Sequence, residues 1–420
     1  MADDNVETIM QPARPFTGPD FIDVRFMLFI AALIAYGIGS SPTPDVIGGA
    51  EIFTGLALIL AAGVWRSAHV IVSIPRAGWA RAAQILLFYG LSVPVLIGVV
   101  AGNASGTIVR DMIAFMFLLL PLFMHDLCAR KAHYRRPLTV AVVIVGLLFS
   151  LRVLAPVFAH ATGPVWYIQP PADPFYLANA PTVLFAALFL GGLAGKELYS
   201  GNNARNGVRI VVFSVLAFLP LAAMALITQR ASIGIVVLSA CLLCAIGFWR
   251  RPHRMVMPVL ALLLVVWVGW DIVHFIGQEA ARKTAIVGLN MRWAEAMAVA
   301  HELVASPLTV IFGKGWGATI ASPAVGGVTV NFTHSLITTY WLKTGMVGLF
   351  LALVYLFHIA NILLRLLFAR PVLALALAGP LAIDVLLYAS FKSLDFGLIL
   401  LLVTIYLSRP VLVASPTRPM

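Results

Sequence analysis

Three basic side chains offer chemistry in this sequence. Arg230 lies in a short turn between two apolar segments, Arg292 opens a segment with helical periodicity, and His334 precedes another long apolar segment. A guanidinium group binds phosphate through two parallel hydrogen bonds and keeps its charge at neutral pH. A neutral histidine accepts a hydroxyl proton near pH 7. Together these residues suit the transfer of a group away from a pyrophosphate leaving group.

Each of these residues also has a plainer interpretation. Arg230 is explained equally well by a side chain that extends to the outer membrane–water interface. Arg292 is explained by an ion pair with Glu295, three residues further along the same predicted helix. A histidine where a loop enters the membrane, such as His334, is in general more often structural than catalytic. The residues alone leave these alternatives open.

Four further residues are candidates for contacts to a pyrophosphate or a glycan. Arg152 lies near the outer end of an apolar segment, where a cation needs a partner or an aqueous cavity. Trp293 and Lys314 belong to the polar segment that also holds Arg292, and Tyr340 follows in the next apolar segment. Cations and aromatic rings of this kind bind phosphate and sugar surfaces respectively.

Membrane-spanning helices must hold these residues. Hydrophobic residues make up 61% of the 420 residues and charged residues only 11%, with a mean hydropathy of +0.98. Apolar windows near the ~20 residues that a helix needs to cross a bilayer recur along the chain, without the alternation of a membrane barrel. We therefore expect an all-α polytopic membrane protein with about twelve transmembrane helices, near 25–41, 46–64, 83–101, 108–127, 138–158, 181–198, 208–228, 231–249, 254–273, 335–361, 371–389 and 393–408.

The distribution of lysine and arginine predicts the orientation of these spans. Alternate loops are basic, such as 129–136 (ARKAHYRR) and 250–254 (RRPHR), whereas opposing loops such as 101–105 carry no Lys or Arg. The positive-inside rule places the basic loops and both tails, 1–24 and 409–420, in the cytoplasm, around a transmembrane domain at 25–408. The net charge of +11 then reflects orientation and contact with anionic membrane lipids, and no nucleic-acid partner is expected.

One outward loop, residues 277–333, departs from this pattern because it is long and carries four Lys and Arg residues. Within it, 292–304 (RWAEAMAVAHELV) repeats apolar residues at helical spacing and predicts an amphipathic helix. A glycine-rich turn, FGKGWG at 312–317, follows. A basic loop on the outer side indicates an anionic ligand.

The order of these motifs resembles the O-antigen ligase and polymerase superfamily. The resemblance rests on an Arg in a turn between two spans (229–232), Arg-Trp at the start of a loop helix (292–293), and Pro-Leu followed by Gly-Lys-Gly-Trp-Gly (307–317). It continues with His-Ser, six residues, then Leu-Lys-x-Gly-x-x-Gly-Leu (334–349). It covers roughly 225–360.

The resemblance implies an inverting, metal-independent glycosyltransferase of the membrane-integral C type, without a cofactor, in the bacterial inner membrane. Its donor would be an undecaprenyl-pyrophosphate-linked glycan, and its acceptor either the lipid A core or a lipid-linked glycan. It further implies that His334 is the base for the acceptor hydroxyl and that Arg230 and Arg292 bind the pyrophosphate. The segment 277–333 would then be the periplasmic catalytic loop. Ligase and polymerase remain equally open.

The main alternative is a twelve-helix secondary transporter of an anionic or lipid-linked substrate. The cytoplasmic loop at 195–208 would divide it into two halves of six spans. No internal repeat is visible, and the longest loop lies outside such a symmetry. A purely scaffolding protein would leave the basic outward loop unexplained. Phosphate-loop, His-Glu-x-x-His and Asp-x-Asp motifs are missing from the sequence, so we expect neither ATP nor a metal.

Overall fold

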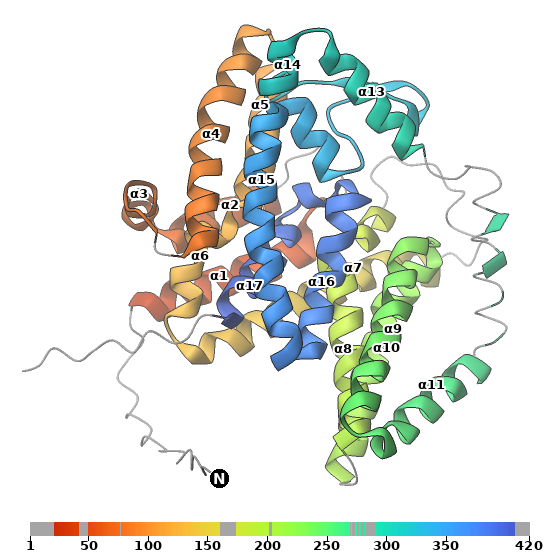
Figure 1. Ribbon diagram of the computed structural model, residues 1–420. Helices are drawn as coiled ribbons and strands as arrows, with labels where there is room; N and C mark the ends of the chain where they lie inside the picture. The colour runs from red at the N-terminus through yellow and green to blue at the C-terminus, as the bar shows by residue number, and fades with distance from the viewer. Residues whose placement is uncertain are drawn as a thin grey trace, which may run out of the picture.

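The computed structural model describes residues 21–407, except 42–48, 76, 160–173, 201–203, 269, 271–273, 275–276, 279–280 and 283–290. The regular structure in this part of the chain is helical apart from two short strands, which agrees with the expected all-α class (Figure 1). Most of the tail at 1–24, the tail at 409–420 and much of the first part of the 277–333 loop lie outside the described residues.

The α-helices, in chain order, are α1 (Phe21–Gly39), α2 (Gly49–Ala62), α3 (Val64–Val72), α4 (Gly78–Val100), α5 (Ser105–Leu118), α6 (Leu120–Ala129), α7 (Arg135–Ala159), α8 (Pro181–Ser200), α9 (Ala204–Leu226), α10 (Arg230–Arg250), α11 (Val256–Val268), α13 (Arg292–Val304), α14 (Pro307–Phe312), α15 (Leu336–Ala369), α16 (Pro371–Leu386) and α17 (Leu394–Leu407). Short 3-10 helices are η1 (Ala132–Tyr134), η3 (Pro174–Asn179), η4 (Pro252–Met255), η5 (Pro323–Val325) and η6 (Ala389–Lys392). Strands β1 (Ile320–Ser322) and β2 (Val328–Val330) form an antiparallel pair with Ala321 opposite Thr329.

The described residues contain seven helices that are long and apolar enough to cross a membrane, or eight if α2 and α3, which meet at a 64° bend, form one span. This makes the chain a multi-pass membrane protein, but the expected number of about twelve spans is not confirmed. The expected span at 254–273 lies partly outside the described residues. For three other expected spans the difference is one of length. The helices α2, α16 and α17 have 14, 16 and 14 residues, and at ~1.5 Å per residue they fall short of the ~30 Å hydrocarbon core.

Contacts between loops agree with the predicted alternation of sides. At one end, Arg250 Nη2 donates a hydrogen bond to the Phe368 carbonyl at 3.0 Å, which joins two loops that the charge pattern places on the same side. At the other end, Asn103 Nδ2 donates to the Trp316 carbonyl at 2.8 Å, which joins two loops predicted to face outward. Which end faces the cytoplasm stays a prediction.

The longest helix, α15, bends where the glycine-rich turn docks on it. Gly345 has φ 66°, a left-handed conformation that interrupts the helical geometry next to the carbonyl groups of Leu342 and Lys343. The backbone N–H of Lys314 donates to Leu342 O at 2.8 Å, and that of Gly315 donates to Lys343 O at 3.0 Å. The turn thereby supplies donors to these two carbonyl groups.

The same turn is fixed to α4 and α5. Trp316 N donates to Pro94 O at 2.9 Å and its indole Nε1 donates to Gly90 O at 2.7 Å, both inside α4. Gly317 N donates to Asp111 Oδ2 of α5 at 2.7 Å, and this carboxylate also forms a buried ion pair with Lys343 of α15. These contacts hold together the ends of α4, α5 and α15 that lie next to the glycine-rich turn.

Candidate active site

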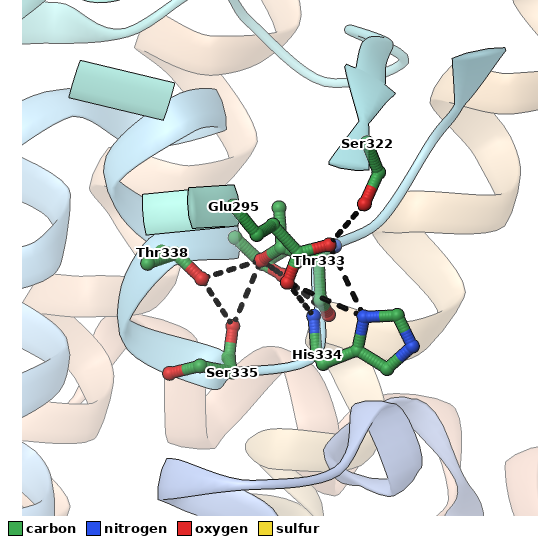
Figure 2. A network of polar contacts seen from close by, with 7 residues as sticks. Glu295, Ser322, Thr333, His334, Ser335 and Thr338 are labelled. Atoms are coloured by element: carbon green, nitrogen blue, oxygen red, sulfur yellow. Dashed lines mark hydrogen bonds and ion pairs between the residues drawn. The ribbon is translucent and has the colours of Figure 1, made fainter. Parts of the chain in front are cut away.

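The helix α13 and the segment before α15 bring Glu295 and His334 together, 39 residues apart in sequence (Figure 2). His334 Nδ1 lies 3.1 Å from Glu295 Oε1 and 3.3 Å from Oε2. The backbone N–H of His334 donates to Glu295 Oε2 at 2.8 Å. The carboxylate therefore holds both the imidazole ring and the main chain of the histidine.

The periodicity of α13 explains why this carboxylate is buried. Glu295, Val299 and Leu303 recur every four residues on its inner face, where the two apolar side chains pack against Ile320 and Leu342. Glu295 is only 2% exposed. A buried carboxylate is costly unless it is hydrogen-bonded. Besides the bonds from His334, Glu295 Oε1 accepts a hydrogen bond from the Ser322 hydroxyl at 2.5 Å.

These contacts favour one tautomer of His334. A hydrogen bond from Nδ1–H to the Glu295 carboxylate leaves the lone pair of Nε2 available as a proton acceptor. The side chain of His334 is 26% exposed, so the ring is held on one side and open on the other. Nε2 has no hydrogen-bond partner among the described residues. A histidine oriented by a carboxylate in this way is the arrangement that general-base catalysis uses.

Electrostatics at Glu295 keep the carboxylate ionised. Burial by itself raises the pKa of Glu295, but the hydrogen bonds that His334 and Ser322 donate lower it by more, and the net effect is a lowered pKa. The ionised form is the one that accepts all of these bonds and stabilises a protonated imidazole. The pair is therefore prepared for the positive charge that forms when His334 takes up a proton.

Hydroxyl groups fix the chain on either side of His334. Thr333 Oγ1 lies 2.6 Å from Thr338 Oγ1 (Figure 2). Ser335 Oγ accepts a hydrogen bond from Ile337 N at 3.2 Å as the N-cap of α15. Such a cap satisfies one of the free N–H groups at a helix start. His334 is thus held in position by the first turn of α15 and by the Glu295 carboxylate of α13.

Arg292 lies one turn before Glu295 but does not pair with it. No ion pair joins the two side chains in the described part of the chain, because the carboxylate is occupied by His334 and Ser322. The ion-pair interpretation of Arg292 is therefore wrong. Its guanidinium lies 5.4 Å from the centre of the Tyr388 ring, a cation–π distance.

The guanidinium of Arg292 retains unused hydrogen-bonding capacity. Its Nη1 is buried, and no acceptor among the described residues reaches it. Burial lowers the pKa of Arg292, Tyr388 and Glu295 raise it, and the positive charge of Arg230 lowers it further. A desolvated guanidinium with an open donor and a second cation nearby is a site for an anion.

Arg230 is the first residue of α10 and is exposed. It follows a strained turn in which Thr228 has φ 54°, and its backbone N–H donates to Thr228 O at 3.0 Å. Its positive charge contributes to the lowered pKa of Arg292.

Two of the other predicted contact residues, Arg152 and Lys314, bind other residues of the same chain. Arg152 donates to the Ser40 carbonyl at 2.6 Å, at the end of α1. Lys314 forms an ion pair with Glu302 on α13. Among the described residues neither side chain contacts His334, and their binding to substrate stays a prediction.

The remaining two predicted residues differ in exposure. Trp293 is 77% exposed on the outer face of α13, opposite Glu295. Tyr340 is buried, with its ring near those of Trp316 and Phe391. Tyr340 thus belongs to the packing under the glycine-rich turn, and its contact with a glycan also stays a prediction.

Sequence reasoning missed Glu295 and Tyr388 as parts of the site. The neighbouring Arg292 offers a local partner for Glu295, but the spacing of Glu295 from Val299 and Leu303 places it on the apolar face of the helix. A carboxylate on an apolar face is a signal for a buried partner. Tyr388 gives no such signal, because its contact with Arg292 joins the segment after α16 to the start of α13, far apart in the sequence.

Within the described residues, no group of three or more His, Cys, Asp or Glu side chains comes together as metal ligands do. The site consists of a carboxylate–histidine pair with Arg292 one turn before the carboxylate on α13, and the charge of Arg230 acts on Arg292. This arrangement suits proton removal next to a bound anion. Comparison of the chain with protein-family models and with curated protein sequences gives no match.

Proposed function

We propose that this protein transfers a glycan from undecaprenyl pyrophosphate to an acceptor hydroxyl, at the periplasmic face of a bacterial inner membrane. The observation that carries the proposal is the arrangement of His334 on the buried Glu295 carboxylate, with the open donor of Arg292 on the same helix. A base beside an anion-binding arginine is what displacement of a pyrophosphate by a hydroxyl requires.

In the proposed reaction, His334 Nε2 accepts the proton of the acceptor hydroxyl while the oxygen attacks the anomeric carbon of the donor glycan. The new carbon–oxygen bond forms as the bond from the anomeric carbon to the pyrophosphate breaks, and undecaprenyl pyrophosphate leaves with the electron pair. Attack from the face opposite the leaving group inverts the anomeric configuration. Glu295 stabilises the imidazolium that results.

Arg292 and Arg230 are proposed to bind the pyrophosphate. Charge grows on the leaving oxygen during the reaction, and guanidinium groups already in place stabilise it more in the transition state than in the ground state. The pKa of Arg292 is lowered first by burial and in part by the charge of Arg230, which indicates that the two cations repel each other. A bound dianion would remove that repulsion.

The test is glycan transfer by the purified protein in lipid vesicles, with a purified undecaprenyl-pyrophosphate-linked donor and without ATP or metal. The lipid A core and lipid-linked repeat units are offered as separate acceptors. Product on the core supports a ligase, and product on the repeat unit supports a polymerase. No product with either acceptor, from a donor shown to be intact, would contradict the proposal and favour transport of an anionic or lipid-linked substrate.

A further inference from the structure

The outer face of α13 carries apolar side chains that the protein leaves uncovered. Trp293, Met297 and Val304 follow one stripe at helical spacing and are 77%, 52% and 70% exposed. The opposite face holds the buried Glu295. An outward-facing loop helix with this division of faces has the pattern of a helix that lies in a membrane interface.

The stripe continues onto the next helix. Leu308 and Ile311 on α14 are 67% and 42% exposed. The end of α14 touches the kink of α15, because a Cβ added at Gly345 would lie 2.3 Å from Ile311 O. The next residue of α15, Met346, is 49% exposed.

From that point the exposed apolar surface runs down a predicted membrane span. Phe350, Leu353 and Phe357 of α15 are 65%, 41% and 65% exposed. Because α15 is long and apolar enough to cross a bilayer, this surface is the one that acyl chains cover. The α13–α14 stripe is therefore continuous with a lipid-facing surface. That continuity identifies lipid, rather than another protein, as its occupant.

We propose that α13 and α14 lie in the outer head-group layer of the membrane, with Trp293, Met297, Val304, Leu308 and Ile311 inserted among the acyl chains. Tryptophan is enriched at this depth because its ring is apolar and its N–H is polar. Polar groups face elsewhere: Lys314 and Glu302 pair with one another, and Arg292 turns toward Tyr388.

The position of α13 in the membrane would also set the depth of the Glu295–His334 pair. The meaning of that depth for catalysis rests on the proposed function. An α-helix with its side chains is about 10–12 Å across, and Glu295 lies on the face of α13 opposite the stripe. The lipid would thus hold the Glu295–His334 pair about one helix diameter from the acyl chains. The pyrophosphate of a lipid-linked donor lies at the same depth, where chain and head group meet.

The experiment measures the depth of single nitroxide labels in vesicles of phosphatidylethanolamine and phosphatidylglycerol. The three native cysteines are replaced by alanine, and a label is placed at Val304 on the stripe. The matched control is Ala305, which is also exposed and lies ~100° around the helix. A label at Phe357, on the lipid-facing side of α15, provides the reference for the acyl-chain region.

Oxygen concentrates in lipid and a nickel chelate in water, so the ratio of their collisions with the label reports its surroundings. We expect a ratio at Val304 several-fold above that at Ala305 and close to that at Phe357. Equal ratios at Val304 and Ala305 would overturn the proposal in favour of a water-exposed loop. Exclusion of both reagents from Val304 would overturn it in favour of a protein contact.

If the Val304 label disturbs folding, the same measurement at Leu308 decides the question. The labels report depth without any substrate. A failed glycan-transfer experiment would therefore leave this inference standing, and a water-exposed Val304 would leave the proposed reaction standing.

Discussion

Two charged pairs link α15 and the segment before it to α5 and α13, and they differ in how exposed their side chains are. The side chains of Lys343 and Asp111 are 1% and 3% exposed, and the carboxylate also accepts the Gly317 N–H. The side chains of His334 and Glu295 are 26% and 2% exposed, and only the carboxylate is fully enclosed. The first pair suits a structural role and the second a chemical one, because only the second keeps a titratable atom accessible.

Removal of Asp111 should have the largest effect on stability. Asp111→Leu leaves the Lys343 ammonium buried without its anion and releases the glycine-rich turn, so we expect the free energy of unfolding to fall by about 3–5 kcal/mol. Denaturant titration in detergent micelles measures it. The double variant Asp111→Leu/Lys343→Met removes both charges and should recover most of the loss. A single variant as stable as the wild type would contradict a structural role for this pair.

The change Glu295→Gln keeps the shape of the side chain and removes its charge. We expect glycan transfer to fall by about 10- to 100-fold, since the neutral amide no longer stabilises a protonated His334. The matched control is Glu302→Gln on the same helix, whose carboxylate pairs with Lys314. Initial rates of transfer in vesicles compare the two. Equal rates in both variants would remove Glu295 from the mechanism.

Arg292→Lys keeps the positive charge but loses the planar pair of donors. We expect about a tenfold loss of kcat/KM, which corresponds to ~1.4 kcal/mol, because one charge-assisted hydrogen bond to the pyrophosphate is lost. The control Arg250→Lys lies at the opposite end of the bundle, where Arg250 bonds to Phe368. Rates over a range of donor concentration test this. Unchanged kinetics in Arg292→Lys would indicate that Arg292 only packs on Tyr388.

The smallest expected effect is a pH dependence of stability at Glu295. The folded-state pKa of Glu295 is lowered below its unfolded value of about 4.3. Its contribution is therefore fully present above pH ~4.3 and is lost as the pH falls through the folded-state pKa. The melting-temperature difference between wild type and Glu295→Gln should shrink over that window. A difference that is constant with pH would contradict an ionised Glu295.

The helical architecture was predictable to the extent that it follows from periodicity. The amphipathic helix expected at 292–304 is α13, residue for residue, and the span expected from 335 begins at Leu336. The number of membrane spans was not predictable, because an apolar window in the sequence does not show where a helix ends. The expected span at 371–389, for example, is α16, which ends at Leu386 after only 16 residues.

The basic residues of the site were predictable from the sequence, but its carboxylate, Glu295, was not. Arg292 and His334 stand out because charge is rare in this chain. The partner of His334 is 39 residues away, and its spacing from Arg292 offered a nearer explanation. Long-range pairs of this kind depend on how α13 packs against β1 and α15, which local sequence does not encode.

The most direct test of the account compares wild type with His334→Ala in the vesicle transfer reaction, with His301→Ala as the control for an exposed histidine on α13. We expect His334→Ala to lose transfer by a factor of roughly 10²–10⁴, the usual contribution of a general base. Its melting temperature should stay near that of the wild type, and His301→Ala should be fully active. Normal transfer by a folded His334→Ala protein would contradict the assignment of the base and with it the proposed mechanism.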